Sequence, residues 1–196
     1  MALSADYRRE LLRKLFHSLS LVYLAVYHLL GSSWFLWLLG SFIVIEGGLE
    51  AVRLRVPALN EKLMRMFGNI HRESEVNRIS GIFWTSSGCF LTVVAYGAHP
   101  RCVAAGFLYL ALGDGAAALA GKAWGRHPFV IGGRTKSVEG SLACLIVCLL
   151  AGWAAGLSFA GVAAGAVVAT AIELLPVPID DNFWSPLASA AAVSLF

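Results

Sequence analysis

Residues 110–125 read LALGDGAAALAGKAWG, and this stretch decides what kind of protein the chain can be. It is apolar and rich in small residues, like a helix within a lipid bilayer, yet it carries the carboxylate of Asp114 between two glycines. A charge at bilayer depth costs about 2.5–3.5 kcal/mol even by the lower estimates. Asp114 must therefore face a protein-lined cavity if the stretch is embedded, and the rest of the sequence indicates that it is.

The composition is that of an integral membrane protein. Of 196 residues, 58% are hydrophobic and 14% are charged, with a mean hydropathy of +0.73, whereas roughly a quarter of the residues of a soluble domain are charged. We therefore expect an all-α, polytopic membrane protein that forms a single domain over residues 1–196. Runs of about 20 apolar residues predict seven transmembrane helices near 15–31, 34–52, 80–98, 102–123, 139–157, 159–175 and 183–196.

The basic residues predict the orientation, because cytoplasmic loops hold an excess of Lys and Arg. If the N-terminus is cytoplasmic, 14 of the 15 Lys and Arg residues lie inside and only Arg101 lies outside. The net charge of +3 is then a topology signal, and we expect no nucleic-acid partner. The location would be the inner membrane of a bacterium, or the endoplasmic reticulum or plastid membrane of a eukaryote.

The long connections all fall on the cytoplasmic side. The segment 53–79 has apolar residues at helical spacing and predicts an interfacial amphipathic helix. The segment 124–138 is a Gly-rich, basic loop, and 176–182 reads PVPIDDN, which is too rich in proline to be helical. Four cysteines fall inside predicted helices, and we expect them to be packing residues: Cys89, Cys102, Cys144 and Cys148.

The acidic residues gather on one side of the predicted membrane. None of the 12 Asp and Glu residues lies in an outer half or an outer loop. An ion or proton pathway usually crosses the whole membrane, so a transporter or channel is a remote alternative, and a cavity open to the cytoplasm fits better. The acids within or beside predicted helices are Glu46, Glu50, Asp114, Glu139, Glu173, Asp180 and Asp181.

The loop 124–138 has the chemistry of an anion site beside these acids. Its glycines allow backbone N–H groups to approach a phosphate, and it leads through Lys136 and Ser137 into a helix N-terminus. Carboxylates and cations together with Mg²⁺ form the usual phosphoryl-transfer apparatus. Gly113 and Gly115 would let a nucleotide or metal reach Asp114, or would serve only helix packing. These residues alone predict a lipid-directed phosphotransferase of unknown donor.

Five motifs make the prediction more specific: RKLFH (13–17), RESEVNRISG (72–81), GDGAAALAGKAWG (113–125), TKSVEGSLA (135–143) and IDDNFWSPL (179–187). In this order, over nearly the whole chain, they resemble the CTP-dependent polyprenol kinase family, which includes dolichol kinase, phytol kinase and CTP-dependent diacylglycerol kinase. The family is also similar to phosphatidate cytidylyltransferases. The chain departs from the pattern at Gly115, where Ala is expected, and in carrying Glu50 before Arg53 where Asp-x-x-Arg is more usual.

The resemblance implies a role for each matching residue. The catalytic residues would be Asp114, Lys136, Glu139 and His17, and the Mg²⁺ ligands Asp114, Glu139 and Asp181. CTP would be bound by Gly113, Gly121, Lys122, Gly125, Thr135, Lys136, Ser137, Gly140, Asp180, Asp181 and Asn182. The lipid would meet Arg13, Lys14, His17, Glu50 and Arg78.

Several of these residues have a structural alternative. Arg13 and Lys14 also suit anchors that reach lipid headgroups. His17 is either a base, a group that orients the hydroxyl, or a hydrogen-bonded interfacial histidine. Asn77 and Arg78 also suit a solvated surface.

The resulting prediction is a CTP-dependent lipid-alcohol kinase at the cytoplasmic face. It would use Mg²⁺ and transfer the γ-phosphoryl of CTP to the hydroxyl of a polyprenol, a phytol-like alcohol or diacylglycerol. The alternative is a CTP-dependent cytidylyltransferase that makes a CDP-lipid. The expected partners are CTP, the lipid substrate and the bilayer, and a homodimer is left open.

Overall fold

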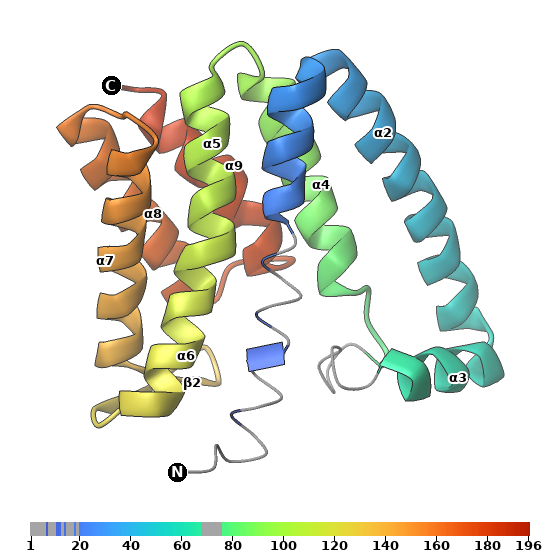
Figure 1. The fold of residues 1–196 in the computed structure, drawn as a ribbon. Coiled ribbons are helices and arrows are strands. Elements are labelled where there is room, and N and C mark those ends of the chain that lie inside the picture. The colour runs from blue at the N-terminus through green and yellow to red at the C-terminus, as the bar shows by residue number, and fades with distance from the viewer. Residues whose placement is uncertain (1–6, 8–10, 13, 15–17, 19, 68–75) are drawn as a thin grey trace.

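The computed structural model describes residues 7, 11–12, 14, 18, 20–67 and 76–196, which form an all-α fold with one small β-hairpin (Figure 1). The predicted all-α class is therefore confirmed. The helices are α2 (Leu21–Arg55), α3 (Pro57–Phe67), α4 (Gly81–Tyr96), α5 (Pro100–Leu108), η2 (Tyr109–Gly113), α6 (Asp114–Trp124), α7 (Val138–Ala154), α8 (Phe159–Leu174) and α9 (Asp181–Val193). The strands are β1 (Pro128–Ile131) and β2 (Arg134–Ser137).

Helix α2 contains a reversal of the chain. Gly31 has φ 77° and ψ 169°, a left-handed conformation that glycine adopts without strain. Figure 1 shows the first part of α2 rising beside α5 and the second part descending away from it. The reversal separates the first two predicted membrane helices, 15–31 and 34–52.

Every other predicted apolar run also contains a helix, but only some of these helices are long and apolar enough to be candidate membrane spans. Within the described residues, Leu21–Arg55 and Pro100–Trp124 are long and apolar enough to span a bilayer. Helices α4, α7 and α8 are apolar and shorter, with 16 or 17 residues. Seven spans remain a prediction.

Side-chain caps start four of the helices. Ser80, Ser137 and Ser158 accept hydrogen bonds from backbone N–H groups in the first turns of α4, α7 and α8, and Asp180 accepts from the N–H of Asn182 at the start of α9. Such caps satisfy donors that a helix leaves unpaired at its N-terminus. Of the segment 176–182, predicted to be non-helical, residues 176–180 are non-helical. Asp181 and Asn182 already belong to α9, because Asp180 caps that helix.

The hairpin corrects the expectation of an irregular loop at 124–138. Strands β1 and β2 pair antiparallel, with Phe129 opposite Lys136 and Ile131 opposite Arg134. The turn residues Gly132 and Gly133 both have positive φ, 57° and 74°, as a tight two-residue hairpin turn requires. This Gly-Gly pair between two short strands is the sequence signal that predicts the hairpin.

Small residues allow the helices that carry the site to pack closely. A Cβ added at Gly140 of α7 would lie 2.7 Å from the carbonyl oxygen of Ala117 on α6, and one at Gly121 would lie 3.1 Å from Ser137 Oγ. Backbones that approach this closely need glycine at the crossing. The contact brings the N-terminus of α7 beside the helix that Asp114 begins.

Candidate active-site cleft

A polar cleft of about 650 Å³ opens at the end of the molecule where the β-hairpin meets α6. Figure 1 shows β2 and the end of α6 at the same end of the fold as α3. The cleft is lined by Lys14, Arg78, Asp114, Ala117, Ala118, Gly121, Lys122, Gly125, Pro128, Arg134, Thr135, Lys136, Ser137, Gly140, Ser141, Glu173 and Asp181. Many of the residues that the sequence predicts for donor binding therefore share one cavity.

Three carboxylates line this cleft, and each is paired with a cation that is distant in sequence. Lys14 Nζ donates to Asp114 Oδ2, and Lys136 Nζ donates to Glu173 Oε1. Arg134 Nη1 donates to Asp181 Oδ2 at 2.9 Å. We call these the three cleft pairs. Asp114 begins α6, Asp181 begins α9 and Glu173 lies in the last turn of α8, so helix ends position all three carboxylates. Two of the three cations, Arg134 and Lys136, come from β2.

Burial makes two of the cleft pairs sensitive to ligands. The side chains of Lys14 and Asp114 are 5% and 19% exposed, and those of Lys136 and Glu173 are 18% and 10% exposed. A buried charge is strongly destabilising when its partner is removed, because it is then shielded from water and unpaired. A bound anion and divalent cation could exchange partners with these pairs, so that cations bind the anion and carboxylates bind the metal.

Asp114 begins α6 directly after η2, one turn of π-helix. A π turn inserts an extra residue into a helix and is frequent at functional sites. Here, the turn lies between α5, which is almost fully buried, and α6, whose face lines the cleft. Asp114 thus lies at the junction between the packed core and the cavity.

The hairpin places its cations through a contact with the segment before α9. A Cβ at Gly132 would meet the ring of Pro176, so the turn packs against the proline-rich residues. Lys136 Nζ also donates to the backbone carbonyl of Glu173 at 2.7 Å. Lys136, whose side chain is 18% exposed, is therefore held at the end of α8, and Arg134, whose side chain is 46% exposed, reaches Asp181 at the start of α9.

Ser137 and Gly140 shape the N-terminus of α7, which also lines the cleft. Ser137 Oγ accepts from Gly140 N at 3.1 Å, and Ser141 Oγ donates to Ser137 O at 3.2 Å. The hydroxyl of Ser137 is thus a helix cap, and backbone N–H groups at a helix N-terminus favour an anion.

The glycines near Asp114 differ in function. A Cβ at Gly113 would lie 2.6 Å from Cys148 Sγ and 3.3 Å from Cys144 Sγ, whereas one at Gly115 would meet nothing within 4 Å. Gly113 therefore serves the packing of η2 against α7, the alternative that the sequence left open. A Cβ added at Gly125 or at Gly121 would lie 3.1 Å from Ser137 Oγ, so both glycines allow the end of α6 to approach the start of α7.

Asp181 is the acid from the IDDN motif that lines the cleft. Asp180 caps α9 and Asn182 is buried in that helix. Asp181 Oδ1 is buried and has no hydrogen-bond partner among the described residues. A buried carboxylate oxygen without a donor is costly, and a metal ion would satisfy it.

Glu139, predicted as a metal ligand, does not line the cleft. Its Oε1 lies 2.6 Å from His127 Nδ1, and its Oε2 accepts from the His127 N–H at 3.3 Å. The parts of the chain that the structure describes contain no group of three or more His, Cys, Asp or Glu residues able to hold a metal. The set Asp114, Glu139 and Asp181 is therefore not brought together.

Asp114 and Asp181 still fit Mg²⁺. Both also line a narrow recess of about 10 Å³ beside Glu173. Mg²⁺ is usually held by one or two carboxylates together with waters and substrate phosphates. The two aspartates, one with a buried oxygen that has no partner among the described residues, would be the protein ligands of such an ion.

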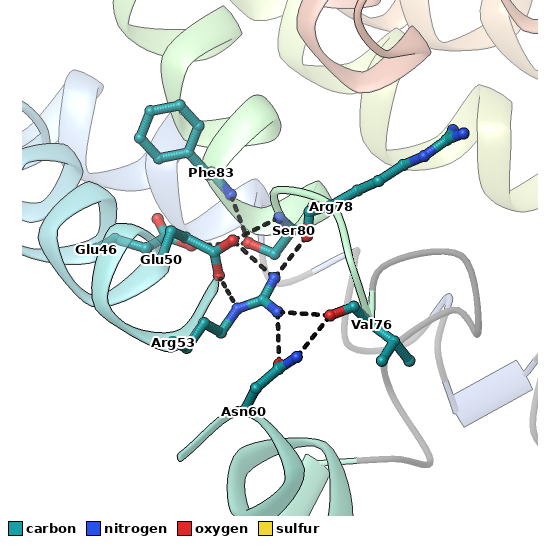
Figure 2. Close-up of polar contacts among 8 residues, drawn as sticks. All are labelled: Glu46, Glu50, Arg53, Asn60, Val76, Arg78, Ser80 and Phe83. Carbon is teal, nitrogen blue, oxygen red and sulfur yellow. Dashed lines mark hydrogen bonds and ion pairs between the residues drawn. The ribbon is translucent and has the colours of Figure 1, made fainter. Parts of the chain in front are cut away.

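The residues predicted to meet the lipid separate into three groups. Lys14 and Arg78 line the cleft. Glu50 is buried in an ion pair with Arg53, at 2.7 and 2.8 Å (Figure 2), and does not line it. Arg13 and His17 lie outside the described residues.

The sequence places Glu173 among the acids on the cytoplasmic side and Arg134 in the basic loop but assigns neither to the site, although both form cleft pairs. Glu173 ends an apolar helix, and Arg134 follows the Gly-Gly turn. Each is a charged residue at the end of a helix or strand, on the same predicted side of the membrane as Asp114. This position is the sequence feature that indicates them. Their pairing could not be predicted, because the partners are 37 and 47 residues apart.

Comparison with known proteins gives one partial similarity. A stretch of 51 residues is 45% identical to a phytol kinase from Synechocystis sp., and it covers 26% of this chain and 22% of that kinase. No protein-family model matches the chain. No solved structure matches it either.

Proposed function

We propose that this protein is a CTP-dependent lipid-alcohol kinase. It would transfer the γ-phosphoryl group of CTP to the hydroxyl of a membrane lipid and release CDP. The observation that carries the proposal is the set of three cleft pairs, in which carboxylates at helix ends and cations from the hairpin surround one cavity. The partial similarity to a phytol kinase supports a lipid alcohol as acceptor.

Different residues of the cleft would have different roles in phosphoryl transfer. Asp114 and Asp181 would hold Mg²⁺, which neutralises charge on the donor phosphates. Lys136 and Arg134 would leave their carboxylates for phosphate oxygens, with Lys122 and the α7 N-terminus beside them. Phosphoryl transfer depends mainly on positioning and charge stabilisation, which these residues supply.

Lys14 connects donor and acceptor in this scheme. Its ammonium contacts Asp114 from a segment that precedes the first apolar helix. When Asp114 takes a metal, Lys14 becomes available to the transferred phosphoryl group or to the acceptor oxygen. Its burial excludes water from that side of the site, and water is the competing acceptor.

The location of the cleft suits an acceptor that lies in a membrane. Seven spans with a cytoplasmic N-terminus, as proposed from the sequence, would put the cleft just inside the cytoplasmic headgroup level. A lipid hydroxyl resides at that depth while its tail stays among the helices. The protein then needs to bring only the soluble donor to the acceptor.

Transfer of label from nucleotide to lipid tests the proposal. Purified protein is incubated with Mg²⁺, γ-labelled CTP and a phytol-like alcohol, a polyprenol or diacylglycerol, with γ-labelled ATP as the control donor. A separate reaction contains phosphatidate, whose phosphate is the acceptor that a cytidylyltransferase needs. We expect label in a lipid phosphate and unlabelled CDP as product. Label released as pyrophosphate, with CMP in the lipid, would instead identify a cytidylyltransferase. Label confined to CTP with every acceptor would contradict both.

A further inference from the structure

A buried arginine outside the cleft forms the densest polar network among the described residues. Arg53 Nε and Nη2 donate to both oxygens of Glu50, at 2.8 and 2.7 Å. Nη1 donates to Asn60 Oδ1 at 2.9 Å, and the Arg53 side chain is only 2% exposed (Figure 2). We call Arg53, Glu50 and Asn60 the Arg53 clamp.

The clamp holds the segment that leads into α4. Arg53 Nη2 donates to the carbonyl of Arg78 at 2.6 Å, and Nη1 to that of Val76 at 3.4 Å. Glu50 Oε2 accepts from Ser80 N at 3.0 Å, and Asn60 Nδ2 donates to Val76 O at 2.8 Å. Alternate residues of 76–80 are thus bound by their backbone to the end of α2 and to α3.

The side chain of Arg78 is left out of this network. Figure 2 shows it extending away from the clamp while its carbonyl points inward. The residue is exposed, and it lines the cleft together with Lys14, Asp114 and Lys136. The Arg78 side chain is long and flexible, and ordering it costs free energy when a ligand binds. A fixed backbone reduces this cost, because the guanidinium then reaches the ligand in a larger fraction of its conformations.

We infer that Arg78 binds a donor phosphate and that Arg53 and Glu50 are positioning residues for it. This inference rests on the proposed function, and it assigns Arg78, which the sequence placed on the lipid, to the nucleotide instead. The reason is its neighbourhood, which consists of the cations and carboxylates of the cleft. Guanidinium suits phosphate because it donates two parallel hydrogen bonds.

A simpler role for the clamp is to anchor α4. The two roles differ in how variants combine. If Arg53 acts through Arg78, changing Arg53 matters only while Arg78 is present. If it only anchors the helix, its loss reduces activity by the same factor in both backgrounds.

A double-mutant cycle on the full-length protein separates them, with KM for CTP and kcat as readouts. We expect Arg78→Met to raise KM about tenfold or more, since the loss of a hydrogen bond to a charged group weakens binding by at least about tenfold. Arg53→Lys keeps the positive charge but loses the paired hydrogen bonds of the guanidinium. It should raise KM about fivefold in the parent and less than about twofold in the Arg78→Met protein. Equal factors in both backgrounds would overturn the inference, as would a change in the KM for the lipid alone.

Two further variants keep the test decisive if Arg53→Lys fails to fold. Asn60→Ala removes the hydrogen bonds of Asn60 with Arg53 and Val76 and leaves the buried Arg53–Glu50 pair in place, and the same cycle with Arg78→Met applies to it. Glu61→Gln breaks the exposed Glu61–Arg65 pair on the same helix and is the control, which should leave KM unchanged. The melting temperature of each variant separates loss of fold from loss of donor binding.

Direct binding of MgCTP by equilibrium dialysis distinguishes the failure of this inference from that of the proposed function. If the parent binds MgCTP but phosphorylates no lipid alcohol, the kinase proposal fails. The double-mutant cycle is then measured with the Kd for MgCTP in place of KM. The inference then stands if Arg53→Lys weakens binding only when Arg78 is present. Equal Kd values for the parent and Arg78→Met would overturn it.

Discussion

The cleft and the Arg53 clamp contain the same kinds of residue and differ in how their hydrogen bonds are satisfied. In the clamp, Glu50 and Arg53 are three residues apart, and the guanidinium contacts two side chains and two carbonyls. In the cleft, the paired residues come from distant segments, and Asp181 retains a buried oxygen without a partner among the described residues. A satisfied network stabilises one conformation, whereas a less satisfied one beside a cavity can exchange partners with a ligand.

The first prediction concerns the shared location of the two regions, because the comparison requires both to face the same compartment. In a background without the four native cysteines, single cysteines at Val177, beside the cleft, and at Lys62, near the clamp, should react with an impermeant thiol reagent only from the cytoplasmic side. A cysteine at Ala98 should react only from the other side. Labelling of Val177 and Lys62 from opposite sides would separate the two regions and remove one wall of the proposed site.

The largest expected effect on catalysis is at Asp114. Asp114→Asn keeps the side-chain volume and removes the charge that would hold Mg²⁺, so kcat/KM should fall by about 10³-fold or more, measured with labelled CTP. The Glu61→Gln protein is the control. Turnover within a few-fold of the parent would make Asp114 a structural partner of Lys14, comparable to Glu50 in the clamp.

A smaller effect is expected at Lys136, whose proposed role is donor binding. Lys136→Met should weaken CTP binding by about tenfold, as expected for a lost charge-assisted contact. The difference from the parent should shrink as salt is added, because screening weakens the contact in the parent. Glu173→Gln should act in the opposite direction or leave CTP binding unchanged, since it removes the competing partner of Lys136. Loss of lipid affinity with unchanged CTP binding in Lys136→Met would move this lysine to the acceptor.

The sequence predicted the helices better than it predicted their contacts. Apolar runs about 20 residues long give the same signal wherever they occur, and each predicted run contains a helix. The hairpin was missed because its strands have only four residues each, too few for an alternating pattern to be distinguished from a polar loop. The Gly132-Gly133 pair is also consistent with a phosphate-binding loop, so it does not by itself predict a hairpin turn.

The sequence predicted which types of residue form the site and that they lie on one side of the membrane. It did not predict which of these residues contact one another. Asp114, Lys136 and Asp181 do share the cleft. Glu139 is the second residue of α7, which begins directly after β2, and it precedes Gly140, which packs against α6. Neighbouring residues on a helix point about 100° apart, so a close contact through Gly140 turns Glu139 away from the cavity. No spacing in the sequence indicates which of the two faces inward.

Glu139 therefore provides the prediction with the smallest expected effect. Its carboxylate is bound to His127, and the His127 side chain is 75% exposed. Ion pairs with an exposed partner contribute little to stability, and an acid in the first turn of a helix adds a small favourable interaction with the helix dipole. We expect Glu139→Gln to lower the melting temperature slightly and to change kcat/KM by less than about threefold, since this carboxylate neither lines the cleft nor completes a clamp. The Mg²⁺ concentration for half-maximal activity should stay that of the parent. A loss as large as that of Asp114→Asn, reversed in part by excess Mg²⁺, would instead restore Glu139 as the metal ligand that the sequence predicts. The rotation of α7 would then have to differ when the donor is bound.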